Sequence, residues 1–414
     1  MYKEKNSPNF LIMDLLLVIY GLETVFPPVT VYFNSTLICT ICMLGWVCIS
    51  FITDRDYYLK QDLRNTYPLI FIAVTVIIPY LFGNGVIGNR YLSLCMIPLG
   101  YFIFNFYKEK ERLNELKKVT MIICGFAVIT FFVTLKALVQ NPYISRSIKS
   151  SGEYSLDLAR KGIGGYGFIY FTVIVSQFLL YIFLKSKLKF VKAFSFIFYL
   201  LSLFFTLKSN YMTALLTVLI ASAVMIIRNY MGKNVINNII LILFAALMVI
   251  LTLNIDSIVA NFSDVIPKRI AQIVNNGNES IAKSIFNEFV NDRWPTMLSS
   301  INIFLKKPLL GMVASRDITL TQGGYLGELG QHSHILDTFA LYGFLIGLFN
   351  VLIIFKPFRG IDGKKIGYGK ALNAAMSVCI IAVYLFNNAT PSTAFSFGII
   401  FPLIRELYNA KEVE

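Results

Sequence analysis

Residues 119–139 read VTMIICGFAVITFFVTLKALV, and Lys136 is the single charged side chain in this stretch. A helix of about 20 mostly apolar residues crosses the hydrocarbon core of a bilayer, which is roughly 30 Å thick. The run is continuous, whereas a strand of a membrane barrel would alternate between apolar and polar residues. The stretch therefore predicts a membrane-spanning helix.

The composition agrees with a chain that has lipid as its main solvent. Of the 414 residues, 56% are apolar and only 14% are charged, and the mean hydropathy is +0.66. Soluble domains have about 25% charged residues, and disordered chains lack the aromatic residues that are abundant here, 36 Phe and 23 Tyr. The net charge of +14 comes without a basic cluster large enough for nucleic acid. It favours contact with membrane phosphates and anionic lipid-linked substrates.

Similar apolar stretches follow one another along the chain and predict an all-α polytopic membrane protein with about twelve transmembrane helices. Helices are expected because a spanning backbone must satisfy its own hydrogen bonds. The predicted spans are about 10–26, 35–52, 67–82, 91–107, 119–139, 165–184, 190–207, 211–228, 236–254, 335–355, 371–387 and 390–404.

One connection, residues 255–334 between the ninth and tenth spans, is far longer than the others. A loop of this length is usually functional or disordered. Its apolar helical spacing and Trp294, which is expected to be buried, predict a small cap with short helices. The chain thus divides into 1–254 with spans one to nine, the loop 255–334, and 335–414 with spans ten to twelve and a tail.

The charges between the spans predict the orientation. If the N-terminus is cytoplasmic and the spans alternate, every short cytoplasmic loop contains Lys or Arg, as the positive-inside rule requires. Both termini are then cytoplasmic, and the long loop is extracytoplasmic. A second loop on that side, residues 140–164, contains Arg146, Lys149, Arg160 and Lys161.

Candidate reactive residues gather in these extracytoplasmic loops. His332 and His334, the two histidines of the chain, follow a glycine-rich turn. A neutral imidazole beside cations is a candidate general base, and an interfacial structural role is the alternative. Arg293, next to Trp294 and Pro295, is typical of a packed guanidinium that binds phosphate. Further cations expected around the same outward site are Lys208, Arg90, Arg160 and Lys161.

Two other motifs are weak evidence for a metal-binding or nucleotide-binding function. Asp54-Arg55-Asp56 matches the D-x-D pattern of metal-binding nucleotide-sugar transferases, but its loop is too short to hold a nucleotide-binding domain. The glycines of 162–167 are not followed by a dinucleotide-binding pattern and are typical of a flexible entry to the sixth span. No metal and no cofactor are therefore expected.

The spacing that follows the glycine-rich turn forms a pattern. His332 is followed five positions on by Asp337, eleven positions on by Gly343, and then by Gly347. This pattern resembles the O-antigen polymerase and O-antigen ligase superfamily, which includes the capsule repeat-unit polymerases. Its register selects His332 rather than His334 as the family histidine. The upstream part of the pattern is Arg293, Trp294, Pro308 and Gly311.

Three positions depart from the family pattern. Ser333 stands where the family has Asn, and Val313 replaces the second glycine of a Gly-x-Gly. The Ser-Arg pair at the start of the eighth span is Ser209-Asn210 here, so that Lys208 is the candidate for the missing cation.

The resemblance implies a polysaccharide polymerase at the outer face of a bacterial cytoplasmic membrane. It would transfer a growing glycan from undecaprenyl pyrophosphate to the next lipid-linked repeat unit, with inversion and without metal. His332 and Arg293 are implied as the catalytic pair. Implied partners are the lipid-linked oligosaccharide, membrane lipid, a chain-length regulator and a flippase. The implied substrate-binding residues are Lys208, Arg90, Arg160, Lys161 and His334.

Two alternatives remain open. A ligase of the same superfamily would use the same residues and move finished glycan to another acceptor. A flippase or other transporter of lipid-linked oligosaccharide is also basic and polytopic. A transporter is expected to have charged groups near the midplane of several spans, whereas here they lie in the outer loops.

Overall fold

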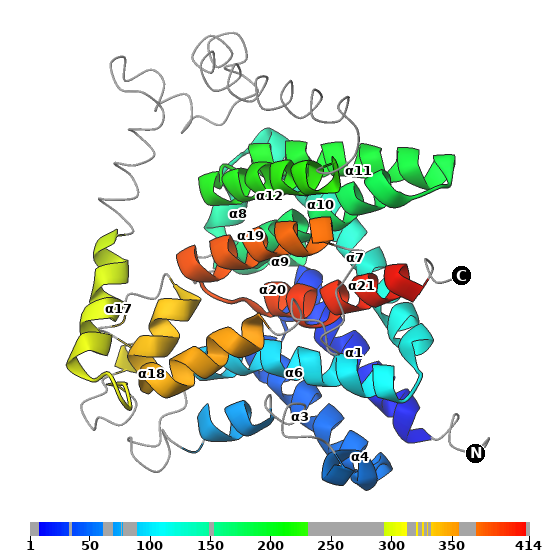
Figure 1. The fold of residues 1–414 in the computed structure, drawn as a ribbon. Coiled ribbons are helices and arrows are strands. Elements are labelled where there is room, and N and C mark those ends of the chain that lie inside the picture. The colour runs from blue at the N-terminus through cyan, green and yellow to red at the C-terminus, as the bar shows by residue number, and fades with distance from the viewer. Residues whose placement is uncertain are drawn as a thin grey trace.

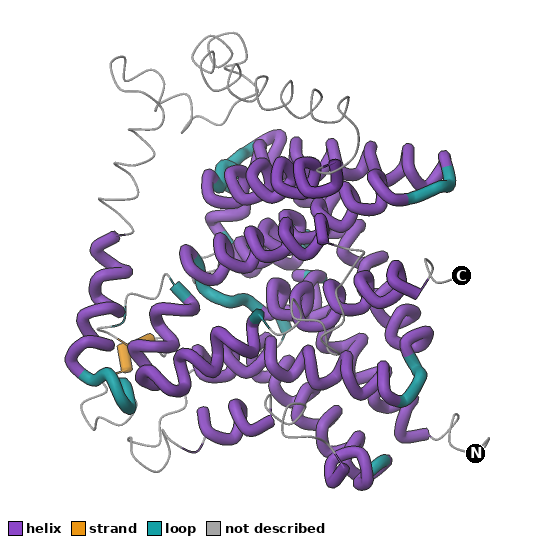
Figure 2. Tube along the Cα trace, in the orientation of Figure 1, coloured by secondary structure: helices purple, strands orange, loops and turns teal. Residues whose placement is uncertain are grey.

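The computed structural model of this chain describes residues 8–32, 35–60, 69–75, 77, 89–148, 153–230, 294–312, 320–321, 325–326, 329, 333–355 and 370–410. Within these ranges the regular structure is helical, apart from two short strands shown in Figure 2. Strands β1 (Leu320–Thr321) and β2 (Tyr325–Leu326) pair antiparallel, with Leu320 opposite Leu326. The all-α class is thereby confirmed for this part of the chain.

Six of the described helices are long and apolar enough to cross a membrane. Two shorter apolar helices are α3 (Ser35–Thr53) and α19 (Lys370–Phe386). A membrane-embedded protein is thus confirmed, and the total of twelve spans stays a prediction, since the predicted ninth span and most of the long loop lie outside the described residues. The six are α1 (Pro8–Val25), α7 (Leu113–Gln140), α10 (Tyr166–Lys185), α11 (Lys189–Lys208), α12 (Met212–Tyr230) and α18 (His334–Ile354).

The other described helices complete the bundle and its ends. The last predicted span is built from two helices joined by a π-helical segment, η5 (Ser396–Ile400). The remaining helices are α2 (Pro27–Thr30), α4 (Arg55–Lys60), α6 (Asn89–Glu109), α8 (Ile144–Ser147), α9 (Glu153–Arg160), α17 (Trp294–Lys306), α20 (Pro391–Phe395) and α21 (Phe401–Ala410).

The bundle is held together by close packing between helices (Figure 1). Helix α1 packs against α3 and α7, and α10 packs against α11, α12 and α19. Trp46 of α3 is fully buried, and its ring meets the edge of Phe106 at 5.2 Å. Phe131 of α7 stacks on Phe205 of α11 at 4.8 Å. Lipid is as apolar as these side chains, so their contribution comes from tight van der Waals contact.

Polar contacts define one end of the bundle, called the proximal end here. Helix α1 begins and α21 ends at this end (Figure 1). The Arg112 guanidinium lies over the Phe10 ring at 4.0 Å, and Lys108 pairs with Glu406 at 2.9 Å. The opposite end is called the distal end. Helix α7 starts beside Arg112 and its 28 residues reach about 42 Å, at 1.5 Å per residue, so α7 runs from the proximal to the distal end.

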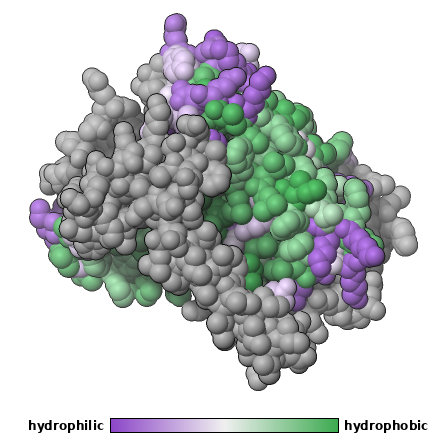
Figure 3. Space-filling model, turned by 90° about the horizontal axis from the view of Figure 1, so that it is seen from above, coloured by the Kyte–Doolittle hydropathy of each residue, from purple (hydrophilic) through white to green (hydrophobic). Residues whose placement is uncertain are grey.

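The sides of the bundle present apolar side chains. On α11, Phe190 is 80% exposed and Ile197 is 55% exposed. Figure 3 shows an apolar surface bounded by hydrophilic residues. An exposed apolar patch of this kind fits contact with lipid, and the polar margins fit the two membrane–water boundaries.

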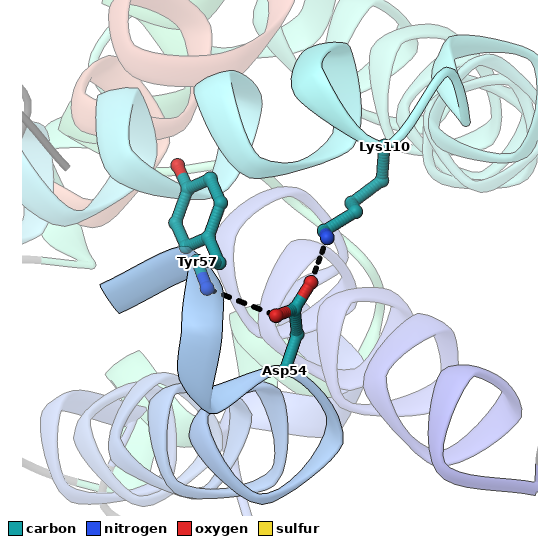
Figure 4. A network of polar contacts seen from close by, with 3 residues as sticks. All are labelled: Asp54, Tyr57 and Lys110. Atoms are coloured by element: carbon teal, nitrogen blue, oxygen red, sulfur yellow. Dashed lines mark hydrogen bonds and ion pairs between the residues drawn. The ribbon is translucent and has the colours of Figure 1, made fainter. Parts of the chain in front are cut away.

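Asp54, the first residue of the D-x-D motif, has a structural use at the proximal end (Figure 4). One carboxylate oxygen accepts a hydrogen bond of 2.9 Å from the backbone N–H of Tyr57, which caps the short helix α4. The other oxygen forms an ion pair with Lys110 of the turn after α6. Among the described residues, no three His, Cys, Asp or Glu side chains form a metal-binding group.

Replacing Asp54 by alanine is expected to lower the free energy of unfolding by about 1 kcal/mol, because both the cap and the ion pair are lost. Asp54→Asn keeps an oxygen for the cap and should cost less. The measurement is the thermal midpoint of purified protein in detergent. Mn²⁺ should leave all midpoints unchanged. A midpoint of the original protein that rises with Mn²⁺, and no longer rises in Asp54→Asn, would show that the motif binds metal.

Candidate functional site

The predicted catalytic pair lies outside the described residues, because neither His332 nor Arg293 falls within them. Arg90 is the second residue of α6, but its side chain is not among those described. The structure therefore places the helix ends next to the catalytic pair, together with the side chains of His334, Lys208, Arg160 and Lys161.

His334 is the first residue of α18, and its side chain is only 1% exposed. Its backbone N–H donates to the carbonyl oxygen of Asn387 at 3.0 Å, and its ring packs against Tyr384 with centroids 5.0 Å apart. Ser333 caps the helix by accepting from the N–H of Leu336 at 3.2 Å. This packing favours the structural alternative for His334, whose role in substrate binding stays a prediction.

Helix α18 is broken at Gly343, where φ is 77° and ψ is −174°. Asn350, from beyond the break, donates to the Thr338 hydroxyl at 3.1 Å and lies 3.4 Å from the His334 ring nitrogen Nε2. In a straight helix, residues twelve positions apart are separated by about 18 Å. The two parts, 334–342 and 344–354, therefore fold against each other as a V (Figure 1).

The sequence predicts 335–355 as one continuous span, and the break is the finding that differs. A φ of 77° is accessible to glycine at little cost and is strained for other residues. Gly347 lets the two arms approach, because a Cβ there would lie 2.4 Å from the Phe339 ring. A hydropathy pattern shows neither the break at Gly343 nor the close approach at Gly347, because glycine is compatible with an apolar run.

The segment after α17, residues 307–312, packs into the bend of α18 at Gly343, which is called the elbow here. A Cβ on Gly343 would lie 2.2 Å from the carbonyl oxygen of Leu309, and a Cβ on Gly311 would lie 2.3 Å from that of Leu341. The two backbones thus touch, and Gly311 also has a positive φ of 66°. These two glycines belong to the sequence pattern described above, and the structure brings them into contact.

The elbow is also joined by a backbone hydrogen bond. The N–H of Phe344, the first residue after the break, donates to the carbonyl oxygen of Pro308 at 2.7 Å. A donor at the start of the second arm, left without a partner by the break, is thereby satisfied by another segment.

Helix α17 runs parallel to the first arm of α18. The Ser300 hydroxyl donates to the Asp337 carboxylate at 2.6 Å, and both residues are buried. Further along both helices, Phe304 meets the edge of Phe339 at 5.7 Å. Because successive contacts advance in the same direction, the N-terminal ends of the two helices lie on the same side. Trp294, which begins α17, is 41% exposed, so the expectation that it is buried is wrong.

The described cations at the distal end have different surroundings. Lys161 pairs with Asp157 at 2.6 Å on the surface, and this carboxylate raises the pKa of Lys161. Arg160 is exposed at the end of α9. Lys208 ends α11 and lies over the Phe204 ring at 5.8 Å. A shared ring of cations stays a prediction.

Residues 387–393 connect the start of α18 with the start of α10. Thr390 caps α20 through a capping box with Thr393. A Cβ on Gly167, in the first turn of α10, would lie 2.7 Å from the Ser392 hydroxyl oxygen. With the bond from His334 to Asn387, these contacts gather three helix starts at the distal end.

Two groups of polar residues, one buried and one partly buried, were not predicted as site residues from the sequence. Asn350 stands alone in an apolar run, and a polar residue inside a predicted span was a usable signal for it. The second group is Arg146 with Asn210, whose carbonyl oxygen accepts from the Arg146 guanidinium at 2.7 Å across 64 residues of sequence. No spacing in the sequence indicates this second contact.

No protein-family model, curated protein or solved structure matches this chain. The resemblance to the O-antigen polymerase and ligase superfamily thus rests on the spacing of the residues quoted above.

Proposed function

We propose that this chain is a glycosyltransferase that polymerises a glycan carried on undecaprenyl pyrophosphate at the outer face of a bacterial cytoplasmic membrane. The parallel pairing of α17 with the first arm of α18 is the observation that supports it most. Arg293 directly precedes Trp294 at the start of α17, and His332 directly precedes the cap Ser333 of α18. Both residues therefore lead into helix ends that lie on one side of a fixed helix pair.

In the proposed reaction the acceptor hydroxyl oxygen forms a bond to the anomeric carbon of the donor. The bond from that carbon to the pyrophosphate oxygen breaks at the same time, which inverts the configuration. His332 takes the hydroxyl proton, and the Arg293 guanidinium stabilises the charge that develops on the leaving pyrophosphate. Pyrophosphate is a weak base, so the proposed reaction needs neither an acid nor a metal or cofactor.

The positions of the described substrate-binding candidates support the same end of the bundle. Lys208 ends α11, Arg160 and Lys161 lie between α7 and α10, and His334 begins α18. All four are at the distal end, which is extracytoplasmic in the predicted orientation. A donor whose polyprenyl tail lies in the membrane would hold its pyrophosphate at the membrane surface, where the distal end of the bundle is predicted to lie.

A flippase or transporter of lipid-linked oligosaccharide is the second candidate, and the broken helix α18 favours it. Many transporters bind substrate at discontinuous helices whose irregular backbone lines a cavity. In α18, however, the break is filled by the backbone of Leu309 and Gly311, which leaves it packed by protein.

Deletion of the gene, followed by gel analysis of surface and lipid-linked glycan, separates these functions. Loss of a polymerase leaves single repeat units at the surface. Loss of a flippase traps the lipid-linked unit inside, and loss of a ligase leaves full-length polymer on the carrier. Either of the last two patterns would contradict the proposed polymerase.

Replacing Arg293 by alanine is expected to reduce polymer formation about 10- to 100-fold, because a charge-assisted hydrogen bond to the leaving group is lost. Lys307→Ala is the matched control, since this exposed residue follows α17. Polymer is measured in membranes supplied with lipid-linked repeat units and normalised to the amount of protein. An Arg293→Ala variant that matches Lys307→Ala would exclude Arg293 from the site.

A further inference from the structure

The distal loop that contains Arg146 is folded onto the bundle. Ala137, Leu158 and Ile163 form a small buried core beneath it. The N–H of Gly164 donates to the Thr134 hydroxyl of α7 at 2.7 Å. These contacts tie α8 and α9 to α7, and Arg146, in α8, therefore has a defined position.

Arg146 reaches the turn between α11 and α12. Its Nη2 donates to the Asn210 carbonyl oxygen at 2.7 Å, and its guanidinium lies over the Tyr211 ring at 4.8 Å. Asn210 is 5% exposed and has a positive φ of 55°. A strained backbone of this kind persists where the surroundings require it, and such positions are concentrated at binding sites.

Three buried donors in this group have no hydrogen-bond partner within the described structure: Nε of Arg146, Nδ2 of Asn210 and the hydroxyl of Tyr211. Each buried donor left unpaired costs about 1–3 kcal/mol. Native proteins rarely tolerate several of them together, and an unfilled ligand position is one explanation. Since all three groups can donate, the ligand has to supply acceptor oxygens.

Charge and aromatic surface narrow the class of ligand. The ring of Tyr166 lies 5.7 Å from that of Tyr211 and 4.9 Å from that of Tyr170. Aromatic rings supply flat apolar surface with a polar tip, which suits a sugar ring. The guanidinium next to them suits a carboxylate, which it binds through parallel hydrogen bonds.

We propose that Arg146, Asn210 and Tyr211 bind the carboxylate of an acidic sugar in the glycan, an inference that rests on the proposed function. A single guanidinium matches one negative charge. A pyrophosphate has more charge and usually meets several cations. Of the other described cations at the distal end, Lys161 is paired with Asp157 and Lys208 lies over the Phe204 ring.

Binding of small ligands to the purified full-length chain in nanodiscs, measured by isothermal titration calorimetry, tests this site. The probes are D-glucuronate, D-glucose and inorganic pyrophosphate. We expect saturable binding of glucuronate, weaker or no binding of glucose, and at least about 10-fold weaker glucuronate binding in Arg146→Gln. Arg55→Gln, an exposed arginine at the proximal end, is the matched control and should bind as the original chain does.

Asn210→Gly is a second variant, which tests the site even if Arg146→Gln fails to fold. Glycine suits the positive φ, keeps the backbone carbonyl that accepts from Arg146, and removes the side-chain amide with its unpaired Nδ2 donor. It should keep the thermal midpoint and weaken glucuronate binding several-fold.

Three results would overturn the proposal: glucuronate binding unchanged in Arg146→Gln, glucose bound as tightly as glucuronate, or weakening of pyrophosphate binding alone. Weakening of pyrophosphate binding alone would mean that Arg146, Asn210 and Tyr211 bind the pyrophosphate of the lipid carrier. Binding of free sugar does not depend on glycosyl transfer. Failure here is therefore distinct from failure of the gene-deletion test, which reports polymerisation.

Discussion

Membranes that contain His332→Ala should form about 100-fold less polymer than membranes with the original chain, at equal amounts of protein. A positioned general base contributes about 10²- to 10⁴-fold to such a transfer, and no other histidine has the register of His332 in the sequence pattern. The measurement is incorporation of labelled lipid-linked repeat units into polymer, resolved by gel.

His334→Ala is the comparison for this variant. Its ring is buried against Tyr384 and near Asn350, so its loss should lower stability more than activity per folded molecule. Full activity in His332→Ala together with lost activity in a folded His334→Ala would identify His334 rather than His332 as the general base. Long polymer in both variants would exclude a histidine base.

Replacing Gly343 by alanine should destabilise the protein by about 3 kcal/mol or more. An alanine at φ 77° costs about 1–2 kcal/mol, and a Cβ there would lie 2.2 Å from the carbonyl oxygen of Leu309. Backbone cannot move aside as a flexible side chain can, so overpacking adds about 1–3 kcal/mol. The expected result is a strong loss of monodisperse protein in detergent, with a lower thermal midpoint.

Gly125→Ala is the matched control for the elbow. It lies in α7, and a Cβ at this position would meet nothing within 4 Å. Alanine in an exposed helix should stabilise slightly, by about 0.5–1 kcal/mol. Equal midpoints for the two glycine variants would mean that α18 is continuous rather than broken.

The positions of many spans followed from the sequence because a bilayer imposes a length on apolar runs. The predicted span 165–184 corresponds to α10, Tyr166–Lys185, and 371–387 corresponds to α19, Lys370–Phe386. The break at Gly343 did not follow, since the sign of φ depends on the backbone of 309–311 that fills the elbow. The exposure of Trp294 likewise depends on tertiary packing.

The sequence could name candidate site residues only where their spacing is local. The spacing of Asp337 and Gly343 is local, and a local pattern can be recognised in one chain. The contact between Arg146 and Asn210 spans 64 residues and depends on how α8 lies against the turn after α11. Asn350 meets Thr338 only because the helix folds back.

The elbow of α18 at Gly343 has a mechanical consequence. Ser300 with Asp337 joins α17 to the first arm of α18, and Pro308, in the segment after α17, accepts a hydrogen bond from Phe344 of the second arm. We therefore expect these elements to move as one unit. The unit is bonded to the rest of the bundle where His334 meets Asn387, where Tyr101 meets Ile354 and where Tyr342 meets Thr75. A displacement of the unit would therefore have to strain or break all three hydrogen bonds.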